Sequence, residues 1–397
     1  HGEAGAWNNL GNVLQELRRF DDALHAHQTA IDLYQQTGNT HGEADAWNNL
    51  GTTLKGLRRF EDALHALETA RNLYQQTGNT HGEAGAWNNL GNVLQELRRF
   101  DDALHAHQTA IDLHQQTDDT HGEATSWNNL GNALKGLRRF EDALHALETA
   151  RNLYQQTDDT HGEAGAWNNL GAALHNLRRF EAALHALETA RNLDQQTGNT
   201  HGEATSWNNS GTALKELRRF DDALHSHQTA IDLYQQTGDT HREAGAWNNI
   251  GTVLQKLRRF DDALHSHQTA IDLHQQTDDT HGEATVWNNI GTAYRGLGRV
   301  DEAVVAGKQA VAMLAAERDW FLAGEAWGEL ATTLTAAGAD TAQVREAWEQ
   351  SAQAYTQAGA DEEAAASREH ANSTESVEAQ LPAVTDLPER DVASESG

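Results

Sequence analysis

The stretch that decides the fold is HGEAGAWNNLGNVLQELRRFDDALHAHQTAIDLYQQTGNT, residues 1–40. This pattern recurs in register, in further blocks that begin at His41, His81, His121, His161, His201, His241 and His281. A gapless period of 40 residues predicts a repeat protein in which each block is one structural unit. We expect eight repeats over residues 1–320, a degenerate ninth repeat with a capping helix over residues 321–370, and a disordered acidic tail over residues 371–397.

Each block carries the hydrophobic pattern of two helices. In the first helix, one face at about 100° per residue holds Trp7, Leu10, Gly11, Leu14 and Leu17. In the second helix, the same periodicity is carried by Phe20, Ala23, Ala30 and Tyr34. Two helices in each block, separated by short polar segments, predict a helical hairpin.

The residues between the helices agree with this assignment. Gly38 stands where a residue in the left-handed conformation ends a helix, and Thr40 to Glu43 matches a capping box that begins the next one. The only prolines are Pro382 and Pro388, so none interrupts the repeats.

A single hairpin of this composition cannot bury enough apolar surface to be stable, whereas stacked hairpins cover one another. The small residues Gly11, Ala23 and Ala30 let helices approach closely, and Trp7 and Phe20 fill the remaining volume. We therefore predict an all-α fold, an α-solenoid of about nine stacked antiparallel helix hairpins that forms a right-handed superhelix.

The negative charge of the chain argues against two classes of partner. Its 59 acidic and 29 basic residues give a formal charge of −30, which would repel nucleic acids and anionic membranes. The arginine pair Arg18 and Arg19 is followed by Asp21 and Asp22, so we expect local neutralisation there. We expect a protein or peptide partner, and neither nucleic acid nor membrane.

Motifs for catalysis or cofactor binding are lacking in the sequence. It contains no phosphate-binding loop, no nucleophile elbow and no cysteine. The 23 histidines include no H-E-x-x-H motif, and equivalent histidines of stacked hairpins should lie about 10 Å apart, too far to share a metal ion. We therefore expect no enzyme activity, no cofactor and no metal site.

The pattern W-x2-L-G-x2-(L/Y)-x8-A-x6-A resembles the tetratricopeptide repeat. In the first block it is read at Trp7, Leu10, Gly11, Leu14, Ala23 and Ala30. The eighth block is nearest to that consensus, with Tyr294 and Gly298. A repeat of 40 residues resembles the extended subgroup of kinesin light chains and cell-polarity adaptors, and similar arrays form the sensors of bacterial signalling ATPases. The resemblance covers residues 1–360.

Two departures from the family pattern lead to separate expectations. Arg18 stands where the family often has a turn glycine; if this position needs a positive φ, arginine would cost about 1 kcal/mol per block. We expect a slightly looser hairpin turn as a result. The aromatic residue in the middle of the second helix is replaced by His27 or Leu67, and for His27 we expect a polar substitute in a core-facing position.

The resemblance also implies a binding surface. In such arrays the first helices line the concave side, and an asparagine at the position of Asn9 often bonds the backbone of an extended peptide. Carried over, the candidate residues are Asn9, Asn49, Asn89, Asn129, Asn169, Asn209, Asn249 and Asn289. Variable neighbours that would set side-chain preference include Asn12, Thr52, Asn92 and Asn132. The alternative is that these asparagines bond adjacent helices, and we expect Asn8 to satisfy a neighbouring helix end.

These patterns favour a scaffold that binds an extended peptide or protein segment on its concave face. The alternative is the ligand-sensing C-terminal arm of a larger bacterial signalling ATPase or transcriptional regulator, because the chain begins in mid-pattern at His1. We expect a cytoplasmic location, and the excess of arginine over lysine indicates a bacterial source. An uncapped first hairpin could also expose an apolar face and promote self-association.

Overall fold

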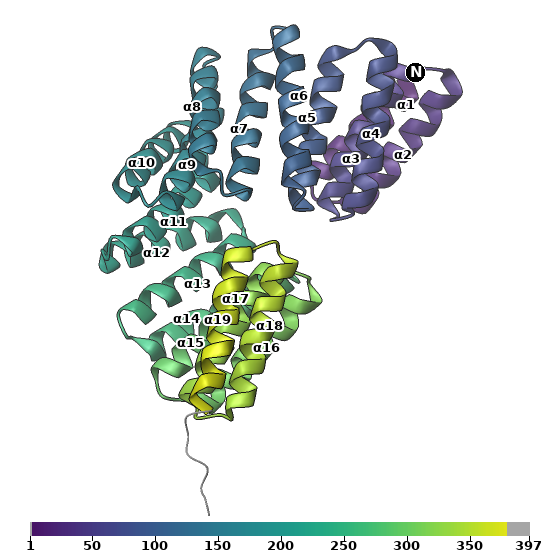
Figure 1. Ribbon diagram of the computed structural model, residues 1–397. Coiled ribbons are helices and arrows are strands. Elements are labelled where there is room, and N and C mark those ends of the chain that lie inside the picture. The colour runs from purple at the N-terminus through teal and green to yellow at the C-terminus, as the bar shows by residue number, and fades with distance from the viewer. Residues whose placement is uncertain (1, 379–397) are drawn as a thin grey trace, which may run out of the picture. The chain divides into compact units, whose positions relative to one another are not determined.

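The computed structural model describes residues 2–378, which form nineteen α-helices and no strand (Figure 1). The odd-numbered helices are α1 (Gly2–Glu16), α3 (Thr40–Gly56), α5 (Thr80–Glu96), α7 (Thr120–Gly136), α9 (Thr160–Asn176), α11 (Thr200–Glu216), α13 (Thr240–Lys256), α15 (Thr280–Gly296), α17 (Trp320–Ala336) and α19 (Asp361–Glu378). The even-numbered helices are α2 (Phe20–Thr37), α4 (Phe60–Thr77), α6 (Phe100–Gln116), α8 (Phe140–Gln156), α10 (Phe180–Thr197), α12 (Phe220–Thr237), α14 (Phe260–Gln276), α16 (Val300–Ala316) and α18 (Thr341–Gln357).

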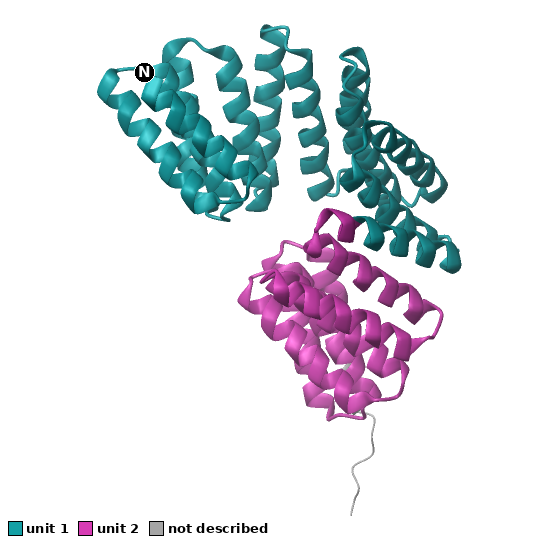
Figure 2. Cartoon of the chain, turned by 180° about the vertical axis from the view of Figure 1, so that it is seen from behind, with its two compact units in different colours: residues 1–233 teal, residues 234–397 magenta. Residues whose placement is uncertain are grey.

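The chain divides into two compact units, residues 1–233 and 234–397 (Figure 2). Within each unit, consecutive helices pack as hairpins, and each hairpin packs on the next. This is the predicted all-α solenoid of stacked helix pairs. None of the helices within residues 2–378 combines the length and the apolar character needed to cross a membrane.

The turn inside each hairpin is tight and left-handed. Arg18 has a φ of 58°, and φ values of 58–60° recur at the equivalent arginines of the next six repeats. The backbone N–H of Arg19 donates to the carbonyl of Leu14 at 2.9 Å, and Arg299 makes the same bond beside Gly298. The expectation of a looser turn is therefore wrong, since arginine and glycine are held in the same conformation.

The turns between hairpins are closed by two caps. Gly38 ends α2 with a φ of 65°, as predicted. The predicted capping box is displaced by one residue, because Thr40 is already helical and the N-cap is Asn39, whose Oδ1 accepts from the backbone N–H of Gly42 at 3.1 Å. Asp119 takes this role at the start of α7.

The core is thin and rich in alanine. Ala23 and Ala30 are fully buried, and the absence of a side chain at Gly51 makes room for Leu67, which would lie 2.5 Å from a Cβ there. The tryptophans are half-buried at the edge of this core, where Trp47 packs against it and donates its indole N–H to Glu43. Small residues thus allow the close helix spacing, and the tryptophans cover the edge of the core.

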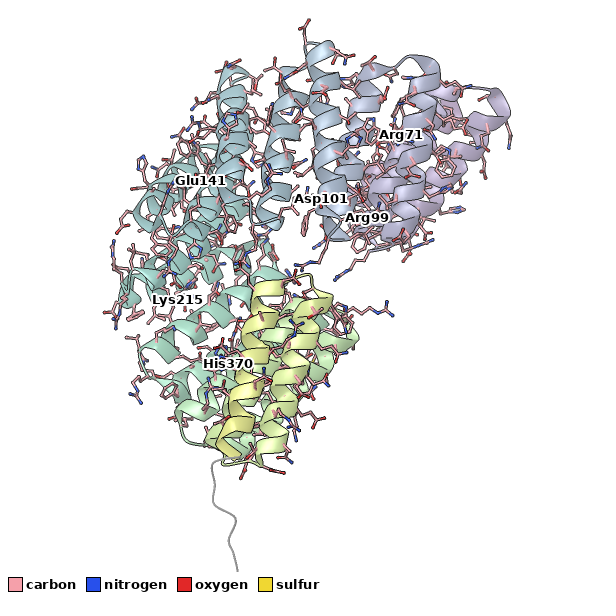
Figure 3. All side chains as sticks on the ribbon, viewed as in Figure 1. Arg71, Arg99, Asp101, Glu141, Lys215 and His370 are labelled. Carbon is pink, nitrogen blue, oxygen red and sulfur yellow. The ribbon has the colours of Figure 1, made fainter. Side chains whose placement is uncertain are left out.

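Two local expectations concern the arginine pairs and the C-terminal region. Arg19 pairs with Asp22 at 2.6 Å, and Arg99 (labelled in Figure 3) pairs likewise with Asp102, so local neutralisation is confirmed. Helix α19 continues past residue 371, where the tail was predicted to begin, and residues 379–397 lie outside the described part.

Candidate peptide-binding surface

The first helices of the hairpins form a continuous layer within each unit. Each of α1, α3, α5, α7 and α9 contacts the next odd-numbered helix, and so do α13 and α15. No comparable contact joins successive even-numbered helices among α2 to α10 or α14 to α18. Helices α1 to α11 and α13 to α17 of odd number therefore lie on the inner side of their stacks, and we call them the first-helix layer.

A row of asparagine pairs runs along this layer. The carboxamide Nδ2 of Asn89 donates to Oδ1 of Asn48 in the preceding hairpin at 3.1 Å, and Asn129 donates to Asn88 at the same distance. The equivalent bonds, 3.0–3.3 Å long, join Asn49 to Asn8, Asn169 to Asn128, Asn209 to Asn168 and Asn289 to Asn248. Within each unit, these bonds tie one repeat to the next through side chains of the first-helix layer. We call the donor asparagines the asparagine ladder.

Buried histidines complete this hydrogen-bond network in some repeats. His107 is fully buried, and its Nδ1 lies 3.0 Å from Oδ1 of Asn88. Because that oxygen can only accept, Nδ1 of His107 carries the proton and Nε2 is free to accept from Gln95 at 2.8 Å. Burial lowers the pKa of His107 to about 4, so the neutral imidazole persists at neutral pH. His27 bonds Asn8 in the same way, in agreement with a polar residue in a core-facing position.

In some repeats, the side chain that precedes the hairpin turn by three residues bonds a ladder residue of the next repeat. Gln255 donates to the backbone carbonyl of Asn289 at 2.7 Å, and Lys135 donates to Oδ1 of Asn169 at 3.1 Å. Burial lowers the pKa of Lys135 to about 8. Lys215, which is labelled in Figure 3, holds the equivalent position on α11. These positions put interchangeable neutral and cationic groups beside the ladder.

The predicted binding residues fall into an exposed end and a half-buried row. Asn9 and Asn12 are exposed on α1, whereas the ladder asparagines of later repeats are half-buried. The predicted neighbours Thr52, Asn92 and Asn132 are half-buried in the same layer. The hydroxyl of Thr52 donates to the carbonyl of Asn49 at 2.8 Å.

Two roles in this layer differ from the sequence-based expectation. Asn8, which was expected to satisfy a helix end, is instead the acceptor for Asn49 of the next repeat, and Asn48, Asn88, Asn128, Asn168 and Asn248 act in the same way. The bridging role of Gln95 and Lys135 was missed altogether. The signal available was the constant Asn-Asn pair in all eight repeats, which demands a partner for both carboxamides.

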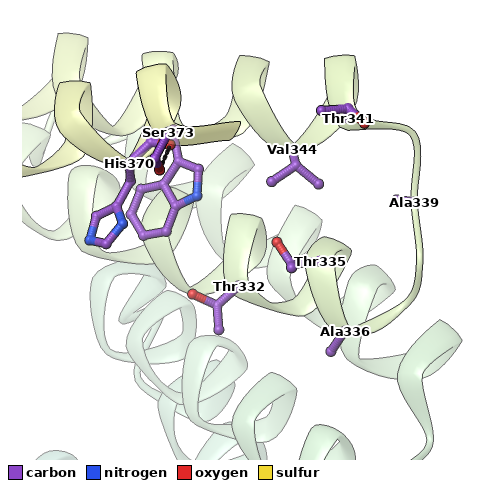
Figure 4. Close-up of a pocket in the computed structure, with 9 residues that line it drawn as sticks. Thr332, Thr335, Ala336, Ala339, Thr341, Val344, His370 and Ser373 are labelled. Carbon is purple, nitrogen blue, oxygen red and sulfur yellow. Dashed lines mark hydrogen bonds between the residues drawn. The ribbon is translucent and has the colours of Figure 1, made fainter. Parts of the chain in front are cut away.

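A separate hollow lies in the last three helices (Figure 4). Its volume is about 690 Å3, and Trp348 stacks on His370 at its edge with ring centroids 4.5 Å apart. It is lined by Thr332, Thr335, Ala336, Ala339, Thr341, Val344, Trp348, His370 and Ser373. These residues interrupt the repeat pattern, and the lining holds no carboxylate or lysine. The hollow is therefore distinct from the asparagine ladder in place and in chemistry.

The sequence matches the family described as tetratricopeptide repeat in four segments, residues 2–76, 82–156, 162–236 and 242–316. Each segment spans two of the 40-residue repeats, and together they cover most of the chain. The chain has no significant match among curated protein sequences.

Several solved structures share the fold at low sequence identity. A Rap protein in complex with competence and sporulation factor is 15% identical, with a TM-score of 0.60 over 96% of this chain and 99% of its own. Aspartyl phosphate phosphatase F from Bacillus subtilis is 12% identical, with a TM-score of 0.57 over 98% of this chain and 97% of its own.

A third structure is a signal transduction ATPase with numerous domains and a tetratricopeptide repeat sensor, from Pyrococcus horikoshii. It is 12% identical, with a TM-score of 0.57 over 87% of this chain and 55% of its own. At these identities the three likenesses establish the helical repeat fold and nothing finer.

Proposed function

From the premise that this chain belongs to the tetratricopeptide repeat family, we propose that it is a protein-interaction scaffold that binds an extended peptide segment along its first-helix layer. The observation that carries the proposal is the asparagine ladder, a row of half-buried carboxamides on the first helices of successive repeats within each unit. Family membership supports the general role of a scaffold, and the Rap protein of similar fold was solved with a bound factor.

The ladder retains hydrogen-bonding capacity after the bonds between repeats are made. A carboxamide offers two N–H donors and an oxygen with two acceptor sites, whereas the bond from Asn89 to Asn48 uses a single N–H. The ladder residues of the inner repeats are half-buried, so part of each side chain still reaches solvent. Because the bond to Asn48 already fixes the Asn89 amide, less side-chain entropy is lost when a segment binds there.

An extended backbone matches such a row because it presents donors and acceptors whatever its sequence. Selectivity would then come from the neighbouring variable positions, which are Asn92 on α5, Asn132 on α7 and the bridging side chains Gln95 and Lys135. The scaffold would bind the backbone through constant residues and read side chains through variable ones.

The test uses peptides selected on the intact chain from a random displayed library. We expect the double variant Asn129→Ala, Asn169→Ala to bind a selected peptide at least tenfold more weakly, about 1.4 kcal/mol or more, in fluorescence polarisation. Helix content measured by circular dichroism should stay unchanged, because both positions are only half-buried.

The matched control is the double variant Asn88→Ala, Asn128→Ala. It breaks the same two bonds between repeats, since Asn88 and Asn128 accept from Asn129 and Asn169, but it leaves the ladder amides in place. Because Asn88 also accepts from the buried His107, circular dichroism must show unchanged helix content for this variant too. If the control loses as much affinity as the ladder variant, or if neither loses any, the ladder has a purely structural role and the proposal fails.

A second candidate function rests on the similarity to the Pyrococcus horikoshii ATPase, whose repeats are described as a sensor. In that case the first-helix layer would bind the signal, and an adjoining ATPase domain would respond to it. The two functions can be distinguished by expressing the complete reading frame and measuring its ATPase rate with and without a selected peptide. An ATPase rate that changes on addition of a selected peptide would favour the sensor, and a frame without a phosphate-binding loop would exclude it.

A further inference from the structure

Two clusters of histidine and aspartate lie outside the first-helix layer. One joins His81 at the start of α5, His114 near the end of α6 and Asp119 at the N-cap of α7. The other is formed by His241, His274 and Asp279, at the same positions of the repeat. The first lies within residues 1–233 and the second within residues 234–397, so each is complete in one unit.

The ligand atoms in each cluster already lie near one another. In the first, Oδ2 of Asp119 is 2.9 Å from Nδ1 of His114 and 3.2 Å from Nδ1 of His81. In the second, Oδ2 of Asp279 is 2.8 Å from Nδ1 of His274 and 3.1 Å from Nδ1 of His241. All three ligand atoms lie within 4.8 Å of one another in both clusters. Tetrahedral zinc with bonds of about 2.0–2.1 Å places its ligand atoms about 3.3 Å apart.

The buried histidine of each cluster has an unsatisfied nitrogen that faces the carboxylate. The side chain of His114 is only 6% exposed, and its Nδ1 contacts Oδ2 of Asp119 at 2.9 Å, in a geometry that is not aligned as a hydrogen bond. Nδ1 of His274 is in the same state. A buried nitrogen whose contact is poorly aligned is incompletely satisfied, and a metal ion between the imidazole and the carboxylate would engage both groups.

The Asp119 carboxylate is oriented by its position at the N-cap of α7. Oδ1 of Asp119 accepts from the backbone N–H of Gly122 at 2.9 Å, which leaves Oδ2 directed at the two imidazoles. A Cβ at Gly122 would come within 2.3 Å of the His114 ring, so glycine is needed for the ring to lie there. The same two features recur at Asp279 and Gly282.

The fourth hairpin has the same arrangement of residues, except that the buried histidine is absent. It has His121 and Asp159 in place, with Nδ1 of His121 at 3.4 Å from Oδ2 of Asp159, but Tyr154 replaces the buried histidine. Tyr154 donates its hydroxyl hydrogen to Thr125 and completes its own hydrogen bonding. Histidine at this position is therefore not required for the fold, and its presence in only the third and seventh repeats calls for another reason.

We propose that each cluster binds one Zn2+ ion through two imidazoles and one carboxylate, with a further coordination position left open to water. Imidazole and carboxylate together suit a metal ion of borderline softness. The expectation that no metal binds rested on equivalent histidines in different repeats, whereas these clusters join three different positions of the repeat. Each ion would link three consecutive helices, α5 to α7 or α13 to α15, and so tie one hairpin to the next.

The experiment measures zinc binding to the chelator-treated chain by isothermal titration calorimetry and by equilibrium dialysis with metal analysis. We expect two tight sites per chain, and Co2+ in the same sites should give the visible absorption of tetrahedral cobalt. Zinc should also raise the melting temperature by mass action.

Matched variants separate these sites from the other histidines. His114→Tyr and His274→Tyr introduce the residue found at Tyr154, so they should fold and each should remove one tight site. Tyr154→His should add a third site beside His121 and Asp159. His185→Ala, at an exposed position, should change nothing. If the double variant His114→Tyr, His274→Tyr binds as much tight zinc as the unaltered chain, or if that chain has no tight site, the proposal is overturned.

Discussion

Residues 1–33 and 81–113 have identical sequences but different surroundings. Leu10 is 44% exposed, whereas Leu90 is 3% exposed, and Val13 at 52% contrasts with Val93 at 1%. The backbone conformation is the same, with a φ of 58° at the turn arginine of both hairpins. The difference arises because α5 packs against α4 of the preceding hairpin, whereas in the described part of the chain α1 packs against α2 and α3, which follow it.

The comparison shows that burial in this fold is a property of the neighbouring repeat and not of the hairpin sequence alone. The polar network follows the same rule. Gln95 bonds His107, whereas the identical Gln15 accepts a bond from Thr53, because the second repeat has a threonine where the fourth has Ala133. A repeat therefore supplies groups whose role is decided by the next repeat along.

The largest expected difference is in the free energy of unfolding after truncation of the paired leucines. Leu90→Ala should destabilise the chain by about 3 kcal/mol through lost burial and a residual cavity. Leu10→Ala should cost under about 1 kcal/mol, since its side chain is already largely in solvent. Urea denaturation of both variants measures the difference, and equal losses would refute the assignment of burial to the neighbouring repeat.

The second prediction concerns acid stability at the buried His107. Its pKa in the folded chain, about 4, lies below the ordinary 6.5, so the unfolded chain takes up a proton first as the pH falls. The stability that depends on neutral His107 is complete above pH 6.5 and is lost progressively towards pH 4, by about 2 kcal/mol at pH 5.

His107→Leu introduces the residue found at Leu67. This variant should lose about 2 kcal/mol less stability between pH 7.5 and pH 5 than the unaltered chain, because it lacks the contribution of His107. Urea denaturation at the two values measures it. The exposed His105, changed to alanine, is the control and should leave the loss unchanged. An unaltered pH dependence in His107→Leu would contradict a neutral buried imidazole.

The third prediction uses the exposed face of α1. Leu10, Val13 and Leu17 are the surfaces that later hairpins bury, so we expect them to promote weak self-association of the chain. The double variant Val13→Glu, Leu17→Glu should weaken it about tenfold, or 1.4 kcal/mol, in sedimentation velocity. Val305→Glu alters an exposed valine elsewhere and should have no effect; equal weakening by both variants would show that the α1 face is not the contact.

The smallest effect is expected at the hairpin turns. Arg178 has a φ of 59°, and the eighth repeat has Gly298 at the equivalent position with a φ of 73°. Arg178→Gly should stabilise the chain by about 1 kcal/mol, because glycine adopts this conformation without the clash of a Cβ. Thermal denaturation measures it, with Arg179→Gly as a neighbouring control at a negative φ. If Arg178→Gly is less stable than the unaltered chain, the Arg178 side chain stabilises the fold by more than the strain of its positive φ destabilises it.

The repeat period and the helical pattern were enough to predict the fold. Trp7, Leu10, Gly11 and Leu14 recur at helical spacing, and a recurring hairpin has no stable arrangement other than a stack. The helix start was misplaced by one residue because Asn39 and Thr40 are both good capping residues, and only the backbone conformation distinguishes them.

The site was harder to predict, because its contacts join different positions of different repeats. The position of the ladder in the first-helix layer was expected from the resemblance to the tetratricopeptide repeat, but the acceptor role of Asn88 and the bridge from Lys135 depend on the offset between stacked hairpins. A single repeat does not encode that offset. His81 and His114, by contrast, belong to one hairpin, where the antiparallel packing of α5 and α6 brings the start of one helix beside the end of the other.

The most direct test of the binding surface is photo-crosslinking of a selected peptide to the unaltered chain, followed by mass spectrometry of the joined fragments. A peptide held by the asparagine ladder should crosslink to the odd-numbered helices, with sites on successive members from α3 to α11. Crosslinks confined to the even-numbered helices, or to the hollow near Trp348 and His370, would contradict binding along the first-helix layer.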